Sequence, residues 1–334
     1  MRTTRKTKRL APITDEEFEL VNENNKELID DFLIYCESID RSPKTTEQYR
    51  SDLRIWMVWI KDNLKNKDFI DIQKRDVVKF QNWCIKEEMS PARIRGLRSA
   101  ASSLSNYIEN MMDDIAPDFR NIINKIPAPT LTPVREKTVL TDEQVEKLLD
   151  DLVKMGKIQQ ACFVAVLAAS GMRKSEIIQC DVDWFVGDDV VIYEGMYVSP
   201  EIRTKGSGKL GKPLKKFVIQ GIVDEYLELW IKEREKLGIT NEALFVIKRK
   251  GKWGRIKDST VDSWMDLFSK LTGEICYAHA FRHYSASFLR RNSVSVDVIR
   301  DFFGHNDSAT TEIYIDIEAS ENLKGMLDFL DEDQ

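Results

Sequence analysis

The side chains of this chain that could carry out chemistry are concentrated near its C-terminus. Its three histidines lie in two short motifs, residues 279–283 (His-Ala-Phe-Arg-His) and residues 304–305 (Gly-His), and Tyr314 follows the second motif. With Arg173 far upstream, this set suits phosphodiester chemistry better than metal binding. Guanidinium groups neutralise phosphate oxygens, imidazoles transfer protons, and a phenol can attack phosphorus to form a covalent phosphotyrosine. The residue types therefore predict cleavage and joining of DNA strands.

Length and composition predict a globular protein with two domains. A chain of 334 residues exceeds what one ordinary core supports, and 42% hydrophobic with 32% charged residues give no signature of disorder. The five cysteines include no Cys-x-x-Cys pair, so we expect buried free thiols instead of disulfides or a zinc site. The chain has no bilayer-spanning apolar run and no signal peptide, so we expect a cytoplasmic, nucleoid-associated protein without a membrane partner.

The distribution of charge points to a polyanionic partner, although the net charge does not. A net charge of −6 argues at first against nucleic acid, because binding a polyanion requires positive surface. The basic residues, however, gather in three segments without acids, at residues 1–9, 202–217 and 248–257. One such cluster is equally well explained as a solvated face. Three of them in an acidic chain favour a nucleic-acid partner.

The first part of the chain predicts a basic arm at residues 1–23 and a helical domain at residues 24–112. Helices are expected at about 24–38, 43–60, 73–86 and 91–110, and Ser42-Pro43 supplies an N-cap and a first-turn proline. Trp56 and Trp59 are expected in the core and not as a platform for base stacking. Periodicity fades over residues 113–137, where four prolines recur, so this segment is the expected linker.

Residues 138–318 are expected to form the second domain, followed by a C-terminal helix or tail at residues 319–334. A capping box at Thr141 and Gln144 starts this domain, and the run 161–169 reads as a buried helix. Further helices are expected at about 223–237, 259–271, 280–291 and 296–303. β-Branched residues at 190–197 and 217–219 flank a glycine-rich basic turn. The predicted fold class is mainly α with a small antiparallel β-sheet.

These motifs resemble the tyrosine recombinases, the family of phage integrases and of Xer-like and Cre-like site-specific recombinases. The resemblance is carried, in order and spacing, by residues 169–177 (Ala-Ser-Gly-Met-Arg-Lys-Ser-Glu-Ile), 279–283 and 303–314. Residues 204–209 resemble the family's lysine turn, and residues 42–49 resemble the start of its DNA-clamping domain. The resemblance implies a helical SAM-like core-binding domain and a mixed α+β catalytic domain that clamp duplex DNA as a C shape.

The resemblance also implies a role for six polar side chains. It assigns the scissile phosphate to Arg173 and Arg282, the nucleophile to Tyr314, the general base to His279, the general acid to Lys205, and a hydrogen bond to a non-bridging phosphate oxygen to His305. Two guanidiniums would then replace a divalent cation, so no metal and no cofactor is expected. The covalent 3'-phosphotyrosine would keep the energy of the broken phosphodiester, so rejoining would need no ATP.

Several assignments have a plainer structural alternative. Arg173 could form an ordinary salt bridge with Glu176, and Tyr314 could be a core aromatic residue. His283 is expected to be a packed or supporting histidine, pointing away from the face that His279 and its arginine neighbour share. The joint presence of all six polar groups favours catalysis over these alternatives.

The side chains expected to bind DNA are basic: Lys44, Arg93, Arg95, Arg98, Lys209 and Lys212. The three arginines lie in the first turns of a predicted helix, where guanidiniums and the positive end of the helix dipole could meet phosphates together. The two lysines of the basic turn also remain alternatives to Lys205 as the general acid.

The function implied by the resemblance is site-specific DNA recombination through a Holliday junction, in the service of a mobile element or a chromosome. The expected assembly is a homotetramer on DNA that is a monomer or weak oligomer when free. The C-terminal helix at 319–334 would dock on a neighbouring subunit in a closed ring, or cap its own domain. The short basic arm at residues 1–23 favours recombination at simple sites, and this expectation is compatible with accessory DNA-bending factors. A type IB topoisomerase-like enzyme and an inactive DNA-binding accessory protein remain alternatives.

Overall fold

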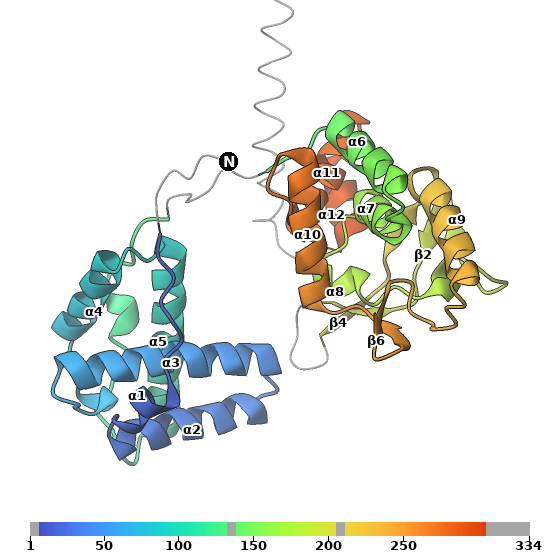
Figure 1. The fold of residues 1–334 in the computed structure, drawn as a ribbon. Helices are drawn as coiled ribbons and strands as arrows, with labels where there is room; N and C mark the ends of the chain where they lie inside the picture. The colour runs from blue at the N-terminus through green and yellow to red at the C-terminus, as the bar shows by residue number, and fades with distance from the viewer. Residues whose placement is uncertain (1–6, 132–137, 205–210, 305–334) are drawn as a thin grey trace, which may run out of the picture. The chain divides into compact units, whose positions relative to one another are not determined.

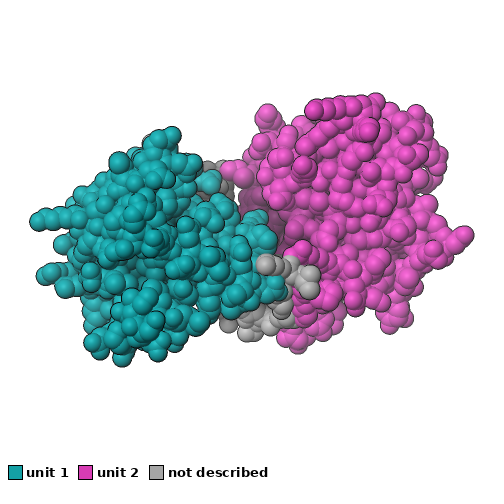
Figure 2. All heavy atoms as spheres, turned by 90° about the horizontal axis from the view of Figure 1, so that it is seen from below, with its two compact units in different colours: residues 1–136, 207–210 teal, residues 137–206, 211–334 magenta. Residues whose placement is uncertain are grey.

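The computed structural model describes residues 7–131, 138–204 and 211–304 of the 334-residue chain. The described residues form two compact units, coloured separately in Figure 2, one made of residues 7–131 and the other of residues 138–204 and 211–304. Each unit has its own hydrophobic core, and the two cores have no residue in common.

The first unit is helical (Figure 1). Its helices are α1 (Asp15–Glu19), α2 (Glu23–Ser38), α3 (Pro43–Asn63), α4 (Lys74–Lys86) and α5 (Pro91–Met111), with 3-10 turns η1 (Phe69–Asp71) and η2 (Ile123–Lys125). As predicted, Ser42 caps α3 by accepting a hydrogen bond from the Thr45 amide, and proline occupies the first turn. Ser90 caps α5 in the same way, accepting from the Arg93 amide. Side-chain caps at these starts explain why the predicted and observed boundaries agree.

The core of this unit is aromatic. Trp56 is fully buried, and its ring stacks on Phe80 with centroids 3.4 Å apart. Its indole N–H donates to the main-chain oxygen of Leu97 at 3.0 Å, which satisfies the one polar atom of the side chain. Trp59 is 4% exposed. The prediction that both tryptophans belong to the core is confirmed.

The first unit is larger than the predicted helical domain at both ends. Before it, α1 precedes the buried Val21, and the Arg54 guanidinium lies 4.5 Å from the centre of the Phe18 ring. After it, Ile123 is fully buried, and the Asn121 amide donates to three oxygens of α5. Parts of the predicted arm and linker thus pack on the helical core. Single turns carry no helical periodicity, so the sequence pattern could not show this.

The second unit combines helices with short strands (Figure 1). Its helices are α6 (Asp142–Lys154), α7 (Ile158–Ser170), α8 (Lys174–Ile177), α9 (Gln220–Lys236), α10 (Asp258–Thr272), α11 (Ala278–Arg291) and α12 (Val296–Phe303), with a 3-10 turn η3 (Val182–Trp184). Every residue from Ala161 to Ser170 is buried, because α7 packs against α6, α9 and α11. A helix that is apolar on all sides requires such enclosure. The buried helix predicted at 161–169 is confirmed.

Three small antiparallel sheets lie in the described part of the second unit. They are β1 (Ile192–Tyr193), β2 (Met196–Val198) and β5 (Phe217–Ile219) in the order β1-β2-β5; β3 (Ile202–Thr204) with β4 (Lys212–Leu214); and β6 (Val246–Arg249) with β7 (Lys252–Arg255). The predicted strand 190–197 is instead a hairpin, because Glu194 and Gly195 both adopt positive φ and reverse the chain. The sequence pattern does not predict the β6–β7 hairpin, since its run of basic residues hides the strand alternation.

Two predictions from composition can be compared with the structure. All five cysteines are buried and unbridged, as expected, and burial raises the pKa of the Cys84 thiol to about 12. Within the described residues, the helices are too short or too polar for any of them to traverse a lipid bilayer.

Candidate active site

Arg173 lies in a short bend between α7 and α8. Gly171 ends α7 with φ of 57°, and Arg173 is the extended residue that precedes α8. Its guanidinium donates to Glu176 Oε1 at 2.8 Å, and its main-chain amide donates to Oε2 at 2.9 Å. Glu176 is fully buried, whereas the Arg173 side chain is 25% exposed. The salt bridge considered as an alternative is therefore present, and it holds Arg173 with one face open to solvent.

Lys216 is a buried cation in this site that the sequence motifs do not single out. Its Nζ lies 3.3 Å from Glu176 Oε2, and its side chain is 3% exposed. It also donates to the main-chain oxygen of Phe303 at 3.3 Å. The signal that could have found it is strand alternation, since Lys216 falls two residues before the buried Val218 and thus on the same face.

The pKa shifts in this pair follow from burial and from neighbouring charges. Burial lowers the pKa of the Lys216 ammonium, against the opposing effect of Glu176, and the charges of Arg282 and Arg173 lower it further. Burial alone would raise the pKa of the Glu176 carboxyl. The Lys216 charge and the hydrogen bonds and charge of Arg173 outweigh burial, so that pKa is lowered. Glu176 is thus held as a carboxylate beneath Arg173.

Arg282, on α11, reaches the same place from the other side. Its NH1 donates to the main-chain oxygen of Gly171 at 2.5 Å, and its NH2 donates to that of Phe303 at 3.3 Å. Its guanidinium carbon lies 4.3 Å from the centre of the Phe303 ring, and the residue is 1% exposed. The two predicted arginines therefore meet around one short segment, although 109 positions separate them in the chain (282 − 173).

Two glycines allow this close approach. A Cβ on Gly171 would lie 2.3 Å from Cε1 of Phe303, and a Cβ on Gly304 would lie 2.9 Å from Cδ1 of Leu214. Both glycines also have positive φ. Only glycine fits such positions without strain or collision. The C-terminal end of α12 is thereby seated against the Arg173 segment and β4.

The histidines of α11 do not divide as predicted. His279 is exposed, one turn before Arg282, in agreement with a role at the surface of the site. His283 does not point away from it, because the two imidazole rings lie 5.5 Å apart in an edge-on arrangement. Residues four apart on a helix share a face, so His279 and His283 lie on the same side of α11 and not on separate sides as predicted. His283 is 7% exposed, in agreement with a packed or supporting residue.

Four predicted site residues lie outside the described residues: Lys205, Lys209, His305 and Tyr314. The C-terminal helix predicted at 319–334 also lies outside them. The strands at the base of the basic turn are described. Thr204 pairs with Lys212 at the base of the basic turn, and its hydroxyl donates to the Lys212 main-chain oxygen at 2.7 Å. Gln179 donates to the Arg203 main-chain oxygen at 2.9 Å. The basic turn therefore starts from a strand tied to the segment that follows Arg173.

The basic residues predicted to bind DNA in the first unit have different environments. Arg98 is 6% exposed, and its guanidinium donates to Gln81 and to the main-chain oxygens of residues 123 and 126. It fastens the segment after α5 to the core, so in this structure its guanidinium is buried and not presented to DNA. Arg93 is paired with Asp52 at 2.5 Å, whereas Arg95 and Lys44 are exposed. Position on the helix alone could not separate the three arginines.

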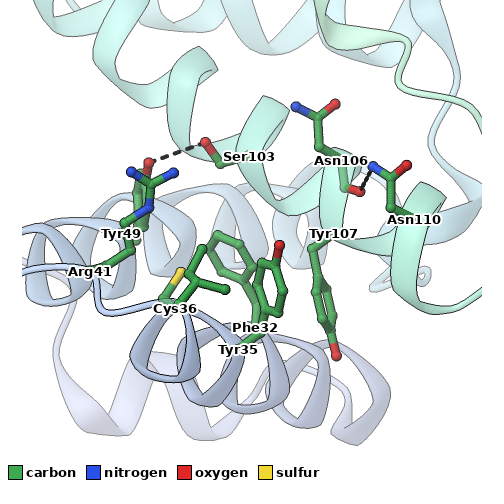
Figure 3. Close-up of a pocket in the computed structure, with 10 residues that line it drawn as sticks. Phe32, Tyr35, Cys36, Arg41, Tyr49, Ser103, Asn106, Tyr107 and Asn110 are labelled. Atoms are coloured by element: carbon green, nitrogen blue, oxygen red, sulfur yellow. Dashed lines mark hydrogen bonds between the residues drawn. The ribbon is translucent and has the colours of Figure 1, made fainter. Parts of the chain in front are cut away.

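A pocket of about 210 Å³ lies in the first unit between α2, α3 and α5 (Figure 3). Figure 3 shows Phe32, Tyr35 and Tyr107 along one side of it, and a hydrogen bond between Tyr49 and Ser103. The two hydroxyl oxygens of that bond are 3.2 Å apart. It contains none of the residues predicted for catalysis. The pocket is therefore no part of the candidate site.

Comparison with known proteins gives consistent results. The sequence model of the phage integrase family matches residues 138–321, a range that includes all six predicted catalytic residues. The SPbeta prophage-derived recombinase-like protein YomM of Bacillus subtilis (strain 168) is 29% identical over 327 residues, covering 96% of this chain and 95% of that protein. Tyrosine recombinase XerD of Listeria innocua serovar 6a is 26% identical over 301 residues, covering 86% of this chain and 93% of that protein.

Two solved structures share the fold. The XerH site-specific recombinase bound to difH substrate, in a pre-cleavage complex, gives a TM-score of 0.61 at 19% identity and covers 93% of this chain and 97% of that chain. A lambda integrase tetramer bound to a Holliday junction gives a TM-score of 0.61 at 17% identity and covers 86% of this chain and 76% of that chain. At these identities the likeness concerns the fold.

Proposed function

Because this chain belongs to the phage integrase family and is a tyrosine recombinase, we propose that it breaks and rejoins DNA strands at specific sites through a covalent 3'-phosphotyrosine. Arg173 and Arg282 hold the scissile phosphate, and Tyr314 attacks the phosphorus. One observation carries this proposal. The Arg282 guanidinium donates to the oxygen of Gly171 at 2.5 Å, two residues before Arg173, so both arginines lie at the same bend of the chain.

The charge of the site supports phosphate binding. Among the described residues named at the site, two cations, Arg173 and Lys216, contact one carboxylate, Glu176, and a third cation, Arg282, lies near Lys216. The excess positive charge is fixed in place before DNA binds, which stabilises the negative charge that grows at phosphorus in the transition state. Arg282 is 1% exposed, so access of the phosphate to it requires a local rearrangement when DNA binds.

The proton transfers follow from the remaining residues. His279, exposed on α11 one turn before Arg282, takes the phenolic proton of Tyr314, whose ordinary pKa of about 10 is too high for attack near neutrality without a base. Lys205 protonates the departing 5' oxygen, with Lys209 and Lys212 as the alternatives in the same turn. His305 binds a non-bridging oxygen. One phosphodiester is exchanged for another, so the strand can be rejoined to a new 5' hydroxyl without ATP.

The partner is duplex DNA. Four copies of this chain bind it as a homotetramer, and strand exchange proceeds through a Holliday junction. A lambda integrase tetramer bound to a Holliday junction has the fold of this chain, which supports that assembly, and so does XerH bound to difH substrate. The exposed basic residues of the β6–β7 hairpin, Lys248, Arg249, Lys250 and Lys252, supply further positive surface. Most of the affinity then comes from phosphate contacts and falls steeply with salt.

Covalent capture of DNA tests this function and selects the target sequence in the same experiment. The protein is incubated with a pool of nicked duplexes of randomised sequence, and complexes that survive denaturing detergent are isolated and sequenced. We expect capture of the 3' phosphate by wild type and none by Tyr314→Phe. Tyr193→Phe is the matched control, because Tyr193 is a 60% exposed tyrosine of β1 in the same unit.

The outcomes separate the candidate functions. Capture by Tyr314→Phe would exclude Tyr314 as the nucleophile, and no capture by wild type would favour an inactive DNA-binding protein. When two duplexes that carry the selected sequence are supplied together, a recombinase forms a four-way junction between them. Relaxation of supercoiled DNA carrying the selected site, without junctions, would favour the topoisomerase-like alternative.

A further inference from the structure

Lys216 joins three segments of the candidate active site that are distant in the sequence. We propose that Lys216 is a positioning residue, whose ammonium group links the carboxylate that holds Arg173 to the last carbonyl of α12, and so fixes Arg173 relative to the segment that continues to His305. This inference rests on the proposed function.

The ammonium group of Lys216 contacts both a carboxylate and a main-chain oxygen. Nζ lies 3.3 Å from Glu176 Oε2 and donates to the Phe303 main-chain oxygen at 3.3 Å. The other oxygen of Glu176 receives the Arg173 guanidinium at 2.8 Å. Phe303 is the last residue of α12, and Gly304 ends the helix in the left-handed conformation. A movement of the ammonium group would therefore disturb both the Arg173 support and the start of the Gly304–His305 motif.

The main chain of Lys216 is itself fixed by two hydrogen bonds to Ser199. Its amide donates to the Ser199 hydroxyl at 2.8 Å, and its carbonyl oxygen accepts from the Ser199 amide at 2.9 Å. Ser199 is 4% exposed and directly follows β2. The lysine stem thus runs from an anchored backbone through the core to a buried head group, and few rotamers satisfy both ends.

The presence of a lysine at this buried position indicates a role in geometry and not in stability. A buried ion pair adds little net stability compared with a well-packed apolar side chain of similar volume, since removing both charges from water is costly. Methionine at position 216 would avoid the desolvation of the ammonium group, but it would leave Glu176 buried with one cation fewer and the Phe303 oxygen without this donor. A lysine with two defined partners specifies geometry, and geometry is what a phosphate-binding site requires.

Single-turnover cleavage of a duplex selected by the wild-type protein tests this inference. The rate is measured with protein in saturating excess, so a change in DNA affinity has no effect on it. We expect Lys216→Met to lower the rate about 100-fold, the loss typical of displacing catalytic groups by about 1 Å. Thermal unfolding of the same protein measures how much stability the substitution removes.

Arg234→Met is the matched control. Arg234 is also a buried cation of the second unit, 4% exposed, and it donates to the main-chain oxygens of Ala243 and Leu244 at 2.9 and 3.0 Å. Its loss removes buried hydrogen bonds but nothing at the site. We expect Arg234→Met to lower the unfolding temperature and to leave the rate of the folded protein unchanged. Equal rate losses in both variants would overturn the inference.

The pH profile of the rate distinguishes positioning from a general structural effect. Glu176 faces Lys216, Arg173 and the Cys180 thiol, and Arg282 faces Lys216. Removing the Lys216 charge raises the carboxyl pKa, so in Lys216→Met the rate should begin to fall at a higher pH than in wild type as the pH is lowered. Lys216→Arg keeps the charge and should restore the wild-type acid limb.

Hydrogen exchange separates this inference from the proposed function. Amides at the end of α12, such as that of Gly304, which donates to Asp301, should exchange faster in Lys216→Met than in wild type or Arg234→Met. If wild type captured no DNA, the proposed function would fail, yet faster exchange would still support the link to α12. Unchanged exchange would refute that link even in an active recombinase.

Discussion

At the scale of single residues, two buried arginines with similar bonds have opposite roles. Arg98 and Arg282 are both almost fully buried, and both donate to main-chain carbonyl oxygens. The carbonyls that Arg98 binds belong to the turn after α5, so it fastens that turn. The carbonyls that Arg282 binds lie beside Arg173 and at the end of α12, so it organises the candidate site. What surrounds the guanidinium, and not its burial, decides the role.

We therefore predict that Arg98→Met destabilises the first unit. The substitution removes the charged donor of two main-chain oxygens, those of Ile123 and Ile126, and a hydrogen bond to a charged group contributes about 1.5–3 kcal/mol. Urea denaturation measures the free energy of unfolding. Arg95→Met is the control, because its exposed side chain should change stability by only about 0.5 kcal/mol or less. Equal stability of the two variants would contradict the structural role of Arg98.

Gly171→Ala should disrupt the site through a collision. Its new Cβ would lie 2.3 Å from the Phe303 ring, in addition to the strain of about 1–2 kcal/mol that an L-residue meets at positive φ. Gly273→Ala isolates the strain, since Gly273 has φ of 74° and no atom within 4 Å of the added carbon. Thermal unfolding and covalent capture should show a larger loss for Gly171→Ala. Similar losses would mean that the contact with α12 is unimportant.

At the scale of elements, the β6–β7 hairpin presents exposed positive charge. Its turn, at Lys250 and Gly251, has positive φ at both residues, a geometry that suits the twist of a two-residue hairpin. Lys248 Nζ lies 5.4 Å from the centre of the Trp253 ring. The basic residues at 248–250 and 252 are exposed, and residues 246–257 contain no acid to neutralise them. Such a surface suits phosphate contacts.

Neutralising this hairpin should weaken DNA binding in a salt-dependent way. We predict that replacing Lys248, Arg249, Lys250 and Lys252 with glutamine lowers affinity and reduces the slope of log affinity against log salt by about 0.9 for each phosphate that the hairpin no longer neutralises. The control replaces four exposed lysines of α6 and α9, namely Lys147, Lys154, Lys232 and Lys236. Binding of the selected duplex, measured by fluorescence anisotropy over a salt series, gives both slopes. Identical slopes would contradict a role for the hairpin.

At the scale of the whole molecule, the chain consists of two units with separate cores. The first core uses residues 21–123 and the second uses residues 140–284, so no core side chain is shared between them. Each unit therefore holds the contacts that it needs to fold. If both bind DNA, their connection in one chain acts as a tether that raises the effective concentration of the second unit once the first is bound.

We predict that residues 1–131 and 138–334 fold as separate chains and that neither binds DNA as tightly as the intact protein. Tethering should make the intact chain bind about 10²–10⁴-fold more tightly than the better fragment. Circular dichroism checks folding, and anisotropy with the selected duplex checks affinity. An equimolar mixture of the fragments is the control. Affinity of that mixture equal to the intact chain would exclude tethering.

The sequence alone determined the helices and most of the motifs. Capping residues such as Ser42 and Thr141 fix where helices begin, and the apolar run at 161–169 requires enclosure whatever its neighbours are. The arginine and histidine motifs indicated the family, and the phage integrase family model confirms it. These signals are local, so they can be read from residues that are close together in the chain.

Only the tertiary structure decided which basic side chains are structural and which belong to the site. Arg93 and Arg98 have the same helical setting in the sequence, but the segment after α5 covers only Arg98. Lys216 looks like part of a solvated basic cluster until the end of α12 and Glu176 meet around it. Burial and pairing depend on contacts between distant segments, and such contacts leave no periodic trace in the sequence.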